Sequence, residues 1–109
     1  MLIVWIYPEL LKNVIFVTYC WYRNKSDYDE IISTSIDQDC KSYEKWLTDS
    51  EIRLSAFDGE IEYIKIAMQP KQLNAWLDRK QLSNNETNRK NYAIEVYTSA
   101  KKNGVENKI

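Results

Sequence analysis

The sequence contains no histidine, and this absence excludes more than any residue that is present. Without imidazole the chain cannot build a serine–histidine or cysteine–histidine nucleophile pair, or a zinc or iron site that depends on histidine ligands. It also lacks the one side chain whose unperturbed pKa suits a general base near pH 7. We therefore expect a protein that is not an enzyme and that carries neither a cofactor nor a metal ion.

Glycine and proline are scarce, with two of each in 109 residues, which excludes fibrous and low-complexity chains. With 44% hydrophobic residues and a net charge of −1, the composition predicts a folded domain. No apolar run reaches the roughly 18 residues that a membrane span needs, and the chain does not start like a secretion signal. We therefore predict a single domain over residues 1–104, a frayed tail over 105–109, a cytoplasmic location and no membrane partner.

Cysteine is also rare, with only Cys20 and Cys40. In the absence of a secretion signal, both are expected to be reduced thiols. Cys20 falls within a predicted strand and Cys40 within a predicted first helical turn, and both positions are typical of small buried residues. Two alternatives stay open: a reactive Cys40 whose pKa is lowered by a helix N-terminus, and a disulfide between the two cysteines.

Runs of β-branched and aromatic residues predict five strands. These strands cover residues 2–7, 13–22, 30–36, 52–57 and 60–67. Asp58 and Gly59 lie between the last two runs and have the composition of a two-residue hairpin turn with positive φ. We therefore expect an antiparallel or mixed sheet.

Three helices are predicted from start signals and from apolar residues spaced three and four apart. Asp37 is an N-cap candidate for a helix over 38–48, and Pro70 suits the first position of a helix that ends near Lys80. Residues 83–86 fit a capping box for a helix that ends near Lys102. The expected fold is α+β in the order β-β-β-α-β-β-α-α, with about five strands and three helices packed mainly on one face of the sheet.

Charge is divided along the chain. Residues 27–62 hold 11 acids against three bases, whereas residues 63–109 hold nine bases against four acids. The folded chain could present an acidic face, which would orient a partner, or its two signs could interleave on a solvated surface. The acidic face that we expect consists of Asp27, Asp29, Glu30, Asp58, Glu60 and Glu62. Such a face would suit an inhibitor or regulator that occupies a basic groove in another protein.

The four tryptophans and eight tyrosines exceed what a core of this size requires. If helices cover one face of the sheet, the other face carries aromatic side chains of the first two strands, and such a patch usually marks an interface. The predicted interface residues are Trp5, Tyr7, Tyr19 and Trp21. Alternatively, helices cover both faces and these residues belong to the core. We predict a non-catalytic binding protein that acts by protein–protein contact, with another protein or with itself as a homodimer.

Two other function classes stay open. The first is a nucleic-acid accessory protein that uses C-terminal basic residues such as Lys90 and Lys101, although Glu95 interrupts any basic stripe. The second is an enzyme that assembles a site between subunits, either from the carboxylates of Glu60 and Glu62 or from a thiol.

Overall fold

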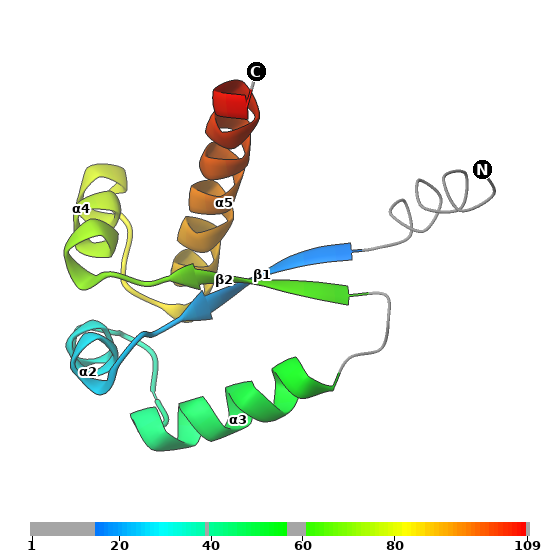
Figure 1. Ribbon diagram of the computed structural model, residues 1–109. Helices are drawn as coiled ribbons and strands as arrows, with labels where there is room; N and C mark the ends of the chain where they lie inside the picture. The colour runs from blue at the N-terminus through cyan, green and yellow to red at the C-terminus, as the bar shows by residue number, and fades with distance from the viewer. Residues whose placement is uncertain (1–14, 39, 57–60, 109) are drawn as a thin grey trace.

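The computed structural model describes residues 15–38, 40–56 and 61–108. Within these ranges the chain forms two strands and four helices, which are arranged as an α+β fold (Figure 1). In chain order they are β1 (Ile15–Trp21), α2 (Lys25–Ser33), α3 (Tyr43–Ser55), β2 (Ile61–Ala67), α4 (Pro70–Lys80) and α5 (Glu86–Lys108).

The two strands pair in parallel, with Ile15 opposite Ile61 and Trp21 opposite Ala67. Parallel neighbours cannot be joined by a tight turn, and α2 and α3 supply the crossover between them. The predicted five-stranded antiparallel or mixed sheet with three helices is therefore wrong, as is its order of elements. The coarser prediction of an α+β fold is confirmed.

The predicted strand over 30–36 is wrong because most of it lies in or directly after α2. The side chain of Asn24 accepts a hydrogen bond from the Asp27 N–H at 2.8 Å and so caps the start of this helix. Tyr28 and Ile31 are then buried on one helical face. The isoleucines of this segment favour a strand locally, but their spacing from Tyr28 fits the helical period equally well.

The predicted helix over 38–48 and the predicted hairpin after it are also wrong, because α3 replaces both the helix and the first strand of the hairpin. Ser42, and not Asp37, caps α3 by accepting a hydrogen bond from the Lys45 N–H at 3.2 Å. The inward stripe of α3 continues through the small, fully buried Ser50 to the half-buried Leu54, so the helix extends to Ser55. The predicted turn at Asp58 and Gly59 lies outside the described residues, as does the predicted strand over 2–7.

Other elements agree with the predictions. Both strands fall within predicted strands, and α4 has the predicted start and end. The predicted α5 is present, but it begins at Glu86, the last residue of the predicted capping box, after Asn85, which accepts a hydrogen bond from the Asn88 N–H at 2.8 Å. It also runs to Lys108 and does not end near Lys102. As the apolar spacing indicated, α4 buries Leu73, Trp76 and Leu77.

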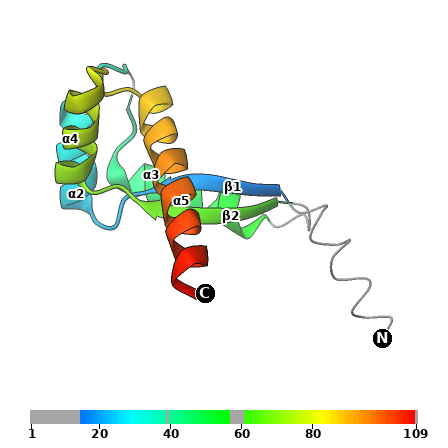
Figure 2. The same cartoon turned by 90° about the horizontal axis from the view of Figure 1, so that it is seen from above.

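Helices cover both faces of the sheet, which corrects the expectation that they pack mainly on one face. The hydroxyl of Tyr19 donates to Ser50 Oγ of α3 at 3.0 Å, whereas Cys20, which projects to the opposite face, donates from Sγ to the Arg89 carbonyl of α5 at 3.5 Å. Figure 1 shows the strands passing between α3 and α5. Figure 2, seen from above, shows α2 and α4 side by side at one end of the sheet.

The hydrophobic core lies at the carboxyl ends of the two strands, where α2, α4 and α5 meet. Its buried members are Tyr22, Tyr28, Ile31, Ile66, Met68, Leu73, Trp76, Leu77, Tyr92 and Ala93. The starts of the strands are less covered, and on β1 Ile15 and Phe16 keep 57% and 46% of their surface exposed. The sheet is therefore well packed at one end and open at the other.

Candidate functional site

In the described part of the chain, one edge of β1 has no strand beside it. The carbonyl of Trp21 accepts a hydrogen bond from the Met68 N–H, which follows β2, at 2.8 Å. Because the backbone groups of successive strand residues point in opposite directions, the N–H and C=O groups of Phe16, Thr18 and Cys20 point away from β2. Among the described residues these outward groups have no hydrogen-bond partner.

A cleft of about 560 Å³ runs along this edge. Val17 and Tyr19 project from one face of β1, Thr18 and Cys20 project from the other, and all four line the same cleft. A hollow can touch both faces of a strand only along its edge, and β2 occupies the other edge of β1. We call this hollow the β1 edge cleft.

The cleft has two walls and one closed end. Arg53 and Trp46 of α3 belong to one wall, and Lys90 and Ile94 of α5 belong to the other. The connection between α2 and α3, which includes Lys41, lines the cleft beside the carboxyl end of β1. The edge of β1 forms the floor between these walls, and Tyr63 of β2 also lines the cleft.

The charged lining of the β1 edge cleft has an excess of cations. Its charged residues are the cations Lys41, Arg53, Arg89 and Lys90 and the acids Asp37 and Glu86. Arg89 pairs with Asp37 at 3.3 Å, Lys90 with Glu86 at 3.1 Å, and Lys41 with Asp49 outside the cleft at 2.7 Å. Arg53, which is exposed, has no ion pair in the described part of the chain.

A buried polar network holds the closed end of the cleft in place. Arg89 is only 6% exposed, and it donates to Asn84 Oδ1 at 2.8 Å and to Ser35 Oγ at 3.1 Å. Asn84 in turn donates to the Ile31 carbonyl at 2.7 Å. The carboxylate of Asp37 accepts both from Arg89 and, at 2.6 Å, from the N–H of Glu86. This network joins the end of α2 and the following connection to the first turn of α5.

Both cysteines line the cleft and both are free thiols. Burial raises the pKa of Cys20 from 9.0 to about 11 against the opposing effect of the Arg89 charge, so the thiol stays protonated at neutral pH. Cys40 is exposed and donates from Sγ to the Asp37 carbonyl at 3.6 Å. It precedes α3 and does not lie in its first turn, which corrects its predicted place.

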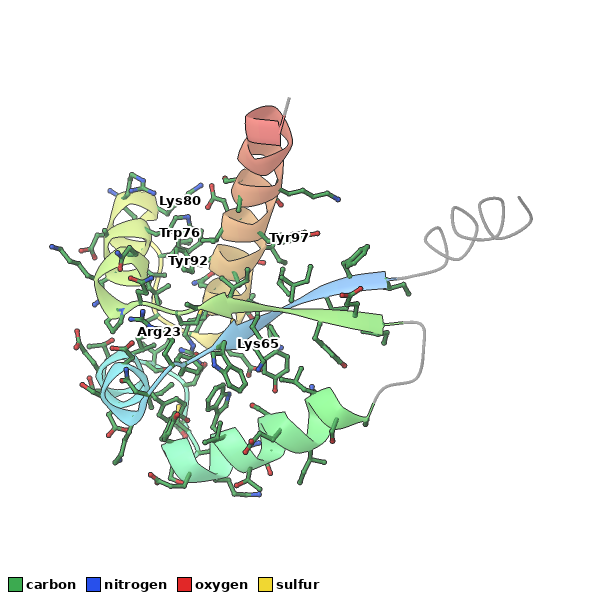
Figure 3. All side chains as sticks on the ribbon, in the orientation of Figure 1. Arg23, Lys65, Trp76, Lys80, Tyr92 and Tyr97 are labelled. Atoms are coloured by element: carbon green, nitrogen blue, oxygen red, sulfur yellow. The ribbon has the colours of Figure 1, made fainter. Side chains whose placement is uncertain are left out.

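The structure places two of the predicted aromatic interface residues against α3. Tyr19 and Trp21 are half-buried, and the Trp21 ring lies 5.1 Å from that of Trp46. The ammonium group of Lys65 lies 4.0 Å from the centroid of the Trp21 ring, and Figure 3 shows Lys65 on the α3 side of the sheet. The other two interface residues, Trp5 and Tyr7, lie outside the described residues.

The predicted acidic face is only partly within the described residues. On α2, Asp27 pairs with Arg23 at 3.0 Å and Asp29 pairs with Lys25 at 2.8 Å, so two of its acids have a cation beside them. Glu30 on α2 and Glu62 on β2 are exposed and lie on different elements. Asp58 and Glu60 lie outside the described residues, so the carboxylate pair of Glu60 and Glu62 has only one described member.

The basic residues proposed for nucleic-acid contact have partners of their own. Lys90 forms an ion pair with Glu86 within α5, and the ammonium group of Lys101 lies 5.9 Å from the ring centroid of Tyr97. The described residues contain no cluster of three or more histidine, cysteine or acidic side chains that could hold a metal ion. Nor is any helix among them long and apolar enough to cross a membrane.

Sequence reasoning did not identify Phe16 of β1 or Ile94 of α5 as exposed apolar residues. Ile15 and Phe16 begin β1, and Ile94 on the α5 wall is 50% exposed. In the sequence these residues resemble ordinary core positions, and only the short sheet shows that nothing described covers them. No family model, curated protein or solved structure matches this chain.

Proposed function

We propose that this chain is a small, non-catalytic accessory protein that acts in the cytoplasm by binding another protein, as an inhibitor or regulator. The observation that carries this proposal is the open edge of β1 with its outward backbone groups. An uncovered edge can pair with a strand of another chain, and proteins that do not use such an edge usually shield it.

The size of the sheet supports the same proposal. Parallel sheets are normally larger, and sheets of three or more strands are the ones that are stable by themselves. Here two strands stand alone in the described part of the chain, and the exposed Ile15 and Phe16 lie at the less covered end. A partner that extended the sheet would cover both the unpaired edge of β1 and the exposed side chains of Ile15 and Phe16. Pairing of this edge with a second copy would give the homodimer as another form of the same function.

The chemistry of the cysteines also favours a binding role in a reducing compartment. Both thiols are free, and the raised pKa of Cys20 disfavours the thiolate that a nucleophile requires. The nucleic-acid role and the enzyme assembled between subunits stay predictions without a further observation in their favour.

Affinity capture from native extract, with and without nuclease, tests the proposed function. We expect nuclease-resistant protein partners, whose recovery falls about tenfold for Phe16→Ser. The matched control is Ile36→Ser, because Ile36 is also exposed, at 64%, but lies in the connection after α2 and not on β1. Recovery that depends on nucleic acid, or that falls equally for both variants, would contradict the proposal.

A further inference from the structure

We infer that the β1 edge cleft binds an extended, acidic segment of another protein, which adds to β1 as a third strand. This inference rests on the proposed function and specifies the chemistry of the partner. Strand addition to an exposed edge gains affinity from main-chain hydrogen bonds, and pockets for alternate side chains supply specificity.

The main chain of β1 supplies a regular set of bonding groups. Phe16, Thr18 and Cys20 each point one N–H and one C=O outward, and alternate strand residues are spaced about 6.6 Å apart. An incoming strand repeats its own bonding groups at the same spacing, so it can pair with all three residues. A compact ligand would leave most of these groups unpaired.

The shape of the cleft favours a single strand over a second copy of this chain. In a second copy the same edge lies between its own α3 and α5, so its edge is itself recessed between two helices. An isolated extended segment has no flanking helices and can lie on the floor between Val17 and Cys20.

The charge of the cleft selects an acidic segment. Side chains of an added strand point alternately toward the two walls. One set would approach Arg53 on α3, and the other set would approach Lys90 on α5. Carboxylates in the segment would give the unpaired Arg53 a counter-ion and would offset the excess of cations in the cleft lining.

A displayed library of random ten-residue peptides, selected on the immobilised full chain, tests this inference. We expect the selected peptides to be enriched in glutamate and aspartate, alternating with β-branched residues. The selected peptides are then synthesised, and N-methylation of alternate residues, which removes edge-facing donors, is expected to weaken binding about tenfold or more.

Two variants of the protein locate the bound peptide. Thr18→Pro removes an outward N–H without removing a bond to β2, and we expect it to weaken binding about tenfold. Arg53→Glu reverses the charge of this residue on the α3 wall and is expected to weaken the binding of acidic peptides to a similar extent. Arg79→Glu is the matched control, because Arg79 is exposed on α4 and does not line the cleft. Circular dichroism confirms that each variant is folded, and Arg53→Glu decides the outcome if Thr18→Pro is not.

Selection without acidic enrichment, or peptides that bind Arg53→Glu as well as the wild type, would overturn the inference. A dimer in sedimentation that Thr18→Pro converts to a monomer would also overturn it, since the occupant would then be a second copy. If the peptides fail while Phe16→Ser still lowers protein capture, the proposed function stands and only the strand-addition inference is lost.

Discussion

At the scale of single residues, Arg89 is the polar side chain on which most of the described structure depends. It is buried, and its guanidinium group donates hydrogen bonds to Ser35 and Asp37, which follow α2, and to Asn84, which precedes α5. Replacing it with an apolar residue leaves Asn84 and Asp37 without their cationic partner, and unpaired buried polar groups are costly.

We therefore predict that Arg89→Met lowers the free energy of unfolding by about 3 kcal/mol. Lys90→Met, one position further along α5, removes only an exposed ion pair and should change it by less than about 0.5 kcal/mol. Urea unfolding of both variants measures the difference. Equal stabilities of the two variants would show that the buried network does not hold the connection to α5.

The raised pKa of Cys20 predicts that the folded protein loses stability at alkaline pH. Its folded-state pKa is raised from 9.0 to about 11 by burial, so between these values the unfolded chain releases a proton that the folded chain retains. Stability is then unaffected by this group below pH 9 and falls as the pH rises from 9 toward 11. Burial also raises the pKa of Tyr22, which adds a loss of the same sign above pH 10.

Urea unfolding at a series of pH values measures this effect. Cys20→Ala should reduce the fall in stability above pH 9, whereas Cys40→Ala, which replaces the exposed thiol, should leave it unchanged. A wild-type stability that is flat from pH 9 to 11 would contradict the burial of Cys20.

At the scale of whole elements, α2 depends on its N-cap more than on its length. It has nine residues, shorter than the roughly 12 that an isolated helix needs, so its ends must be stabilised. We predict that Asn24→Ala lowers the free energy of unfolding by about 1 kcal/mol. Asn91→Ala, at an exposed position inside α5, should be neutral or slightly stabilising. A neutral Asn24→Ala, measured by thermal unfolding, would count against the cap.

The elements that the sequence predicts well are those whose signals are local. Pro70 and the apolar residues that follow define α4, and the residues before Glu86 define the start of α5. The elements that the sequence predicts wrongly are those where strand propensity and helical spacing of apolar residues compete. The isoleucines at positions 31 and 32 favour a strand by propensity, and Ser50 interrupts the apolar stripe of α3.

The candidate site is less predictable than the elements, because it is created by topology. Which edge of β1 is open depends on its pairing with β2, and residues far apart in sequence, such as Lys41, Arg53 and Lys90, meet only around that edge. The inward position of Arg89 follows from helical spacing. The positions of its partners Ser35 and Asp37 could not be predicted in this way, because a strand and a helix N-cap were predicted for the segment that contains them.

At the scale of the whole molecule, the described residues form a two-stranded parallel sheet between two helices, and the edge of β1 that faces away from β2 is unpaired. The packed end of the sheet carries the core, and the open end carries exposed apolar residues and the β1 edge cleft. In the described part of the chain a packed core is thus combined with an unpaired edge of β1 that lines a cleft, which is the arrangement expected of a protein that completes its sheet with a partner.

Amide hydrogen exchange along β1, followed residue by residue by NMR, tests this claim most directly. We expect slow exchange at Val17, Tyr19 and Trp21, whose N–H groups face β2, and fast exchange at Phe16, Thr18 and Cys20. On binding of an acidic peptide the second set should become slow as well. Equal protection of both sets in the isolated protein would contradict the open edge and with it the proposed binding role.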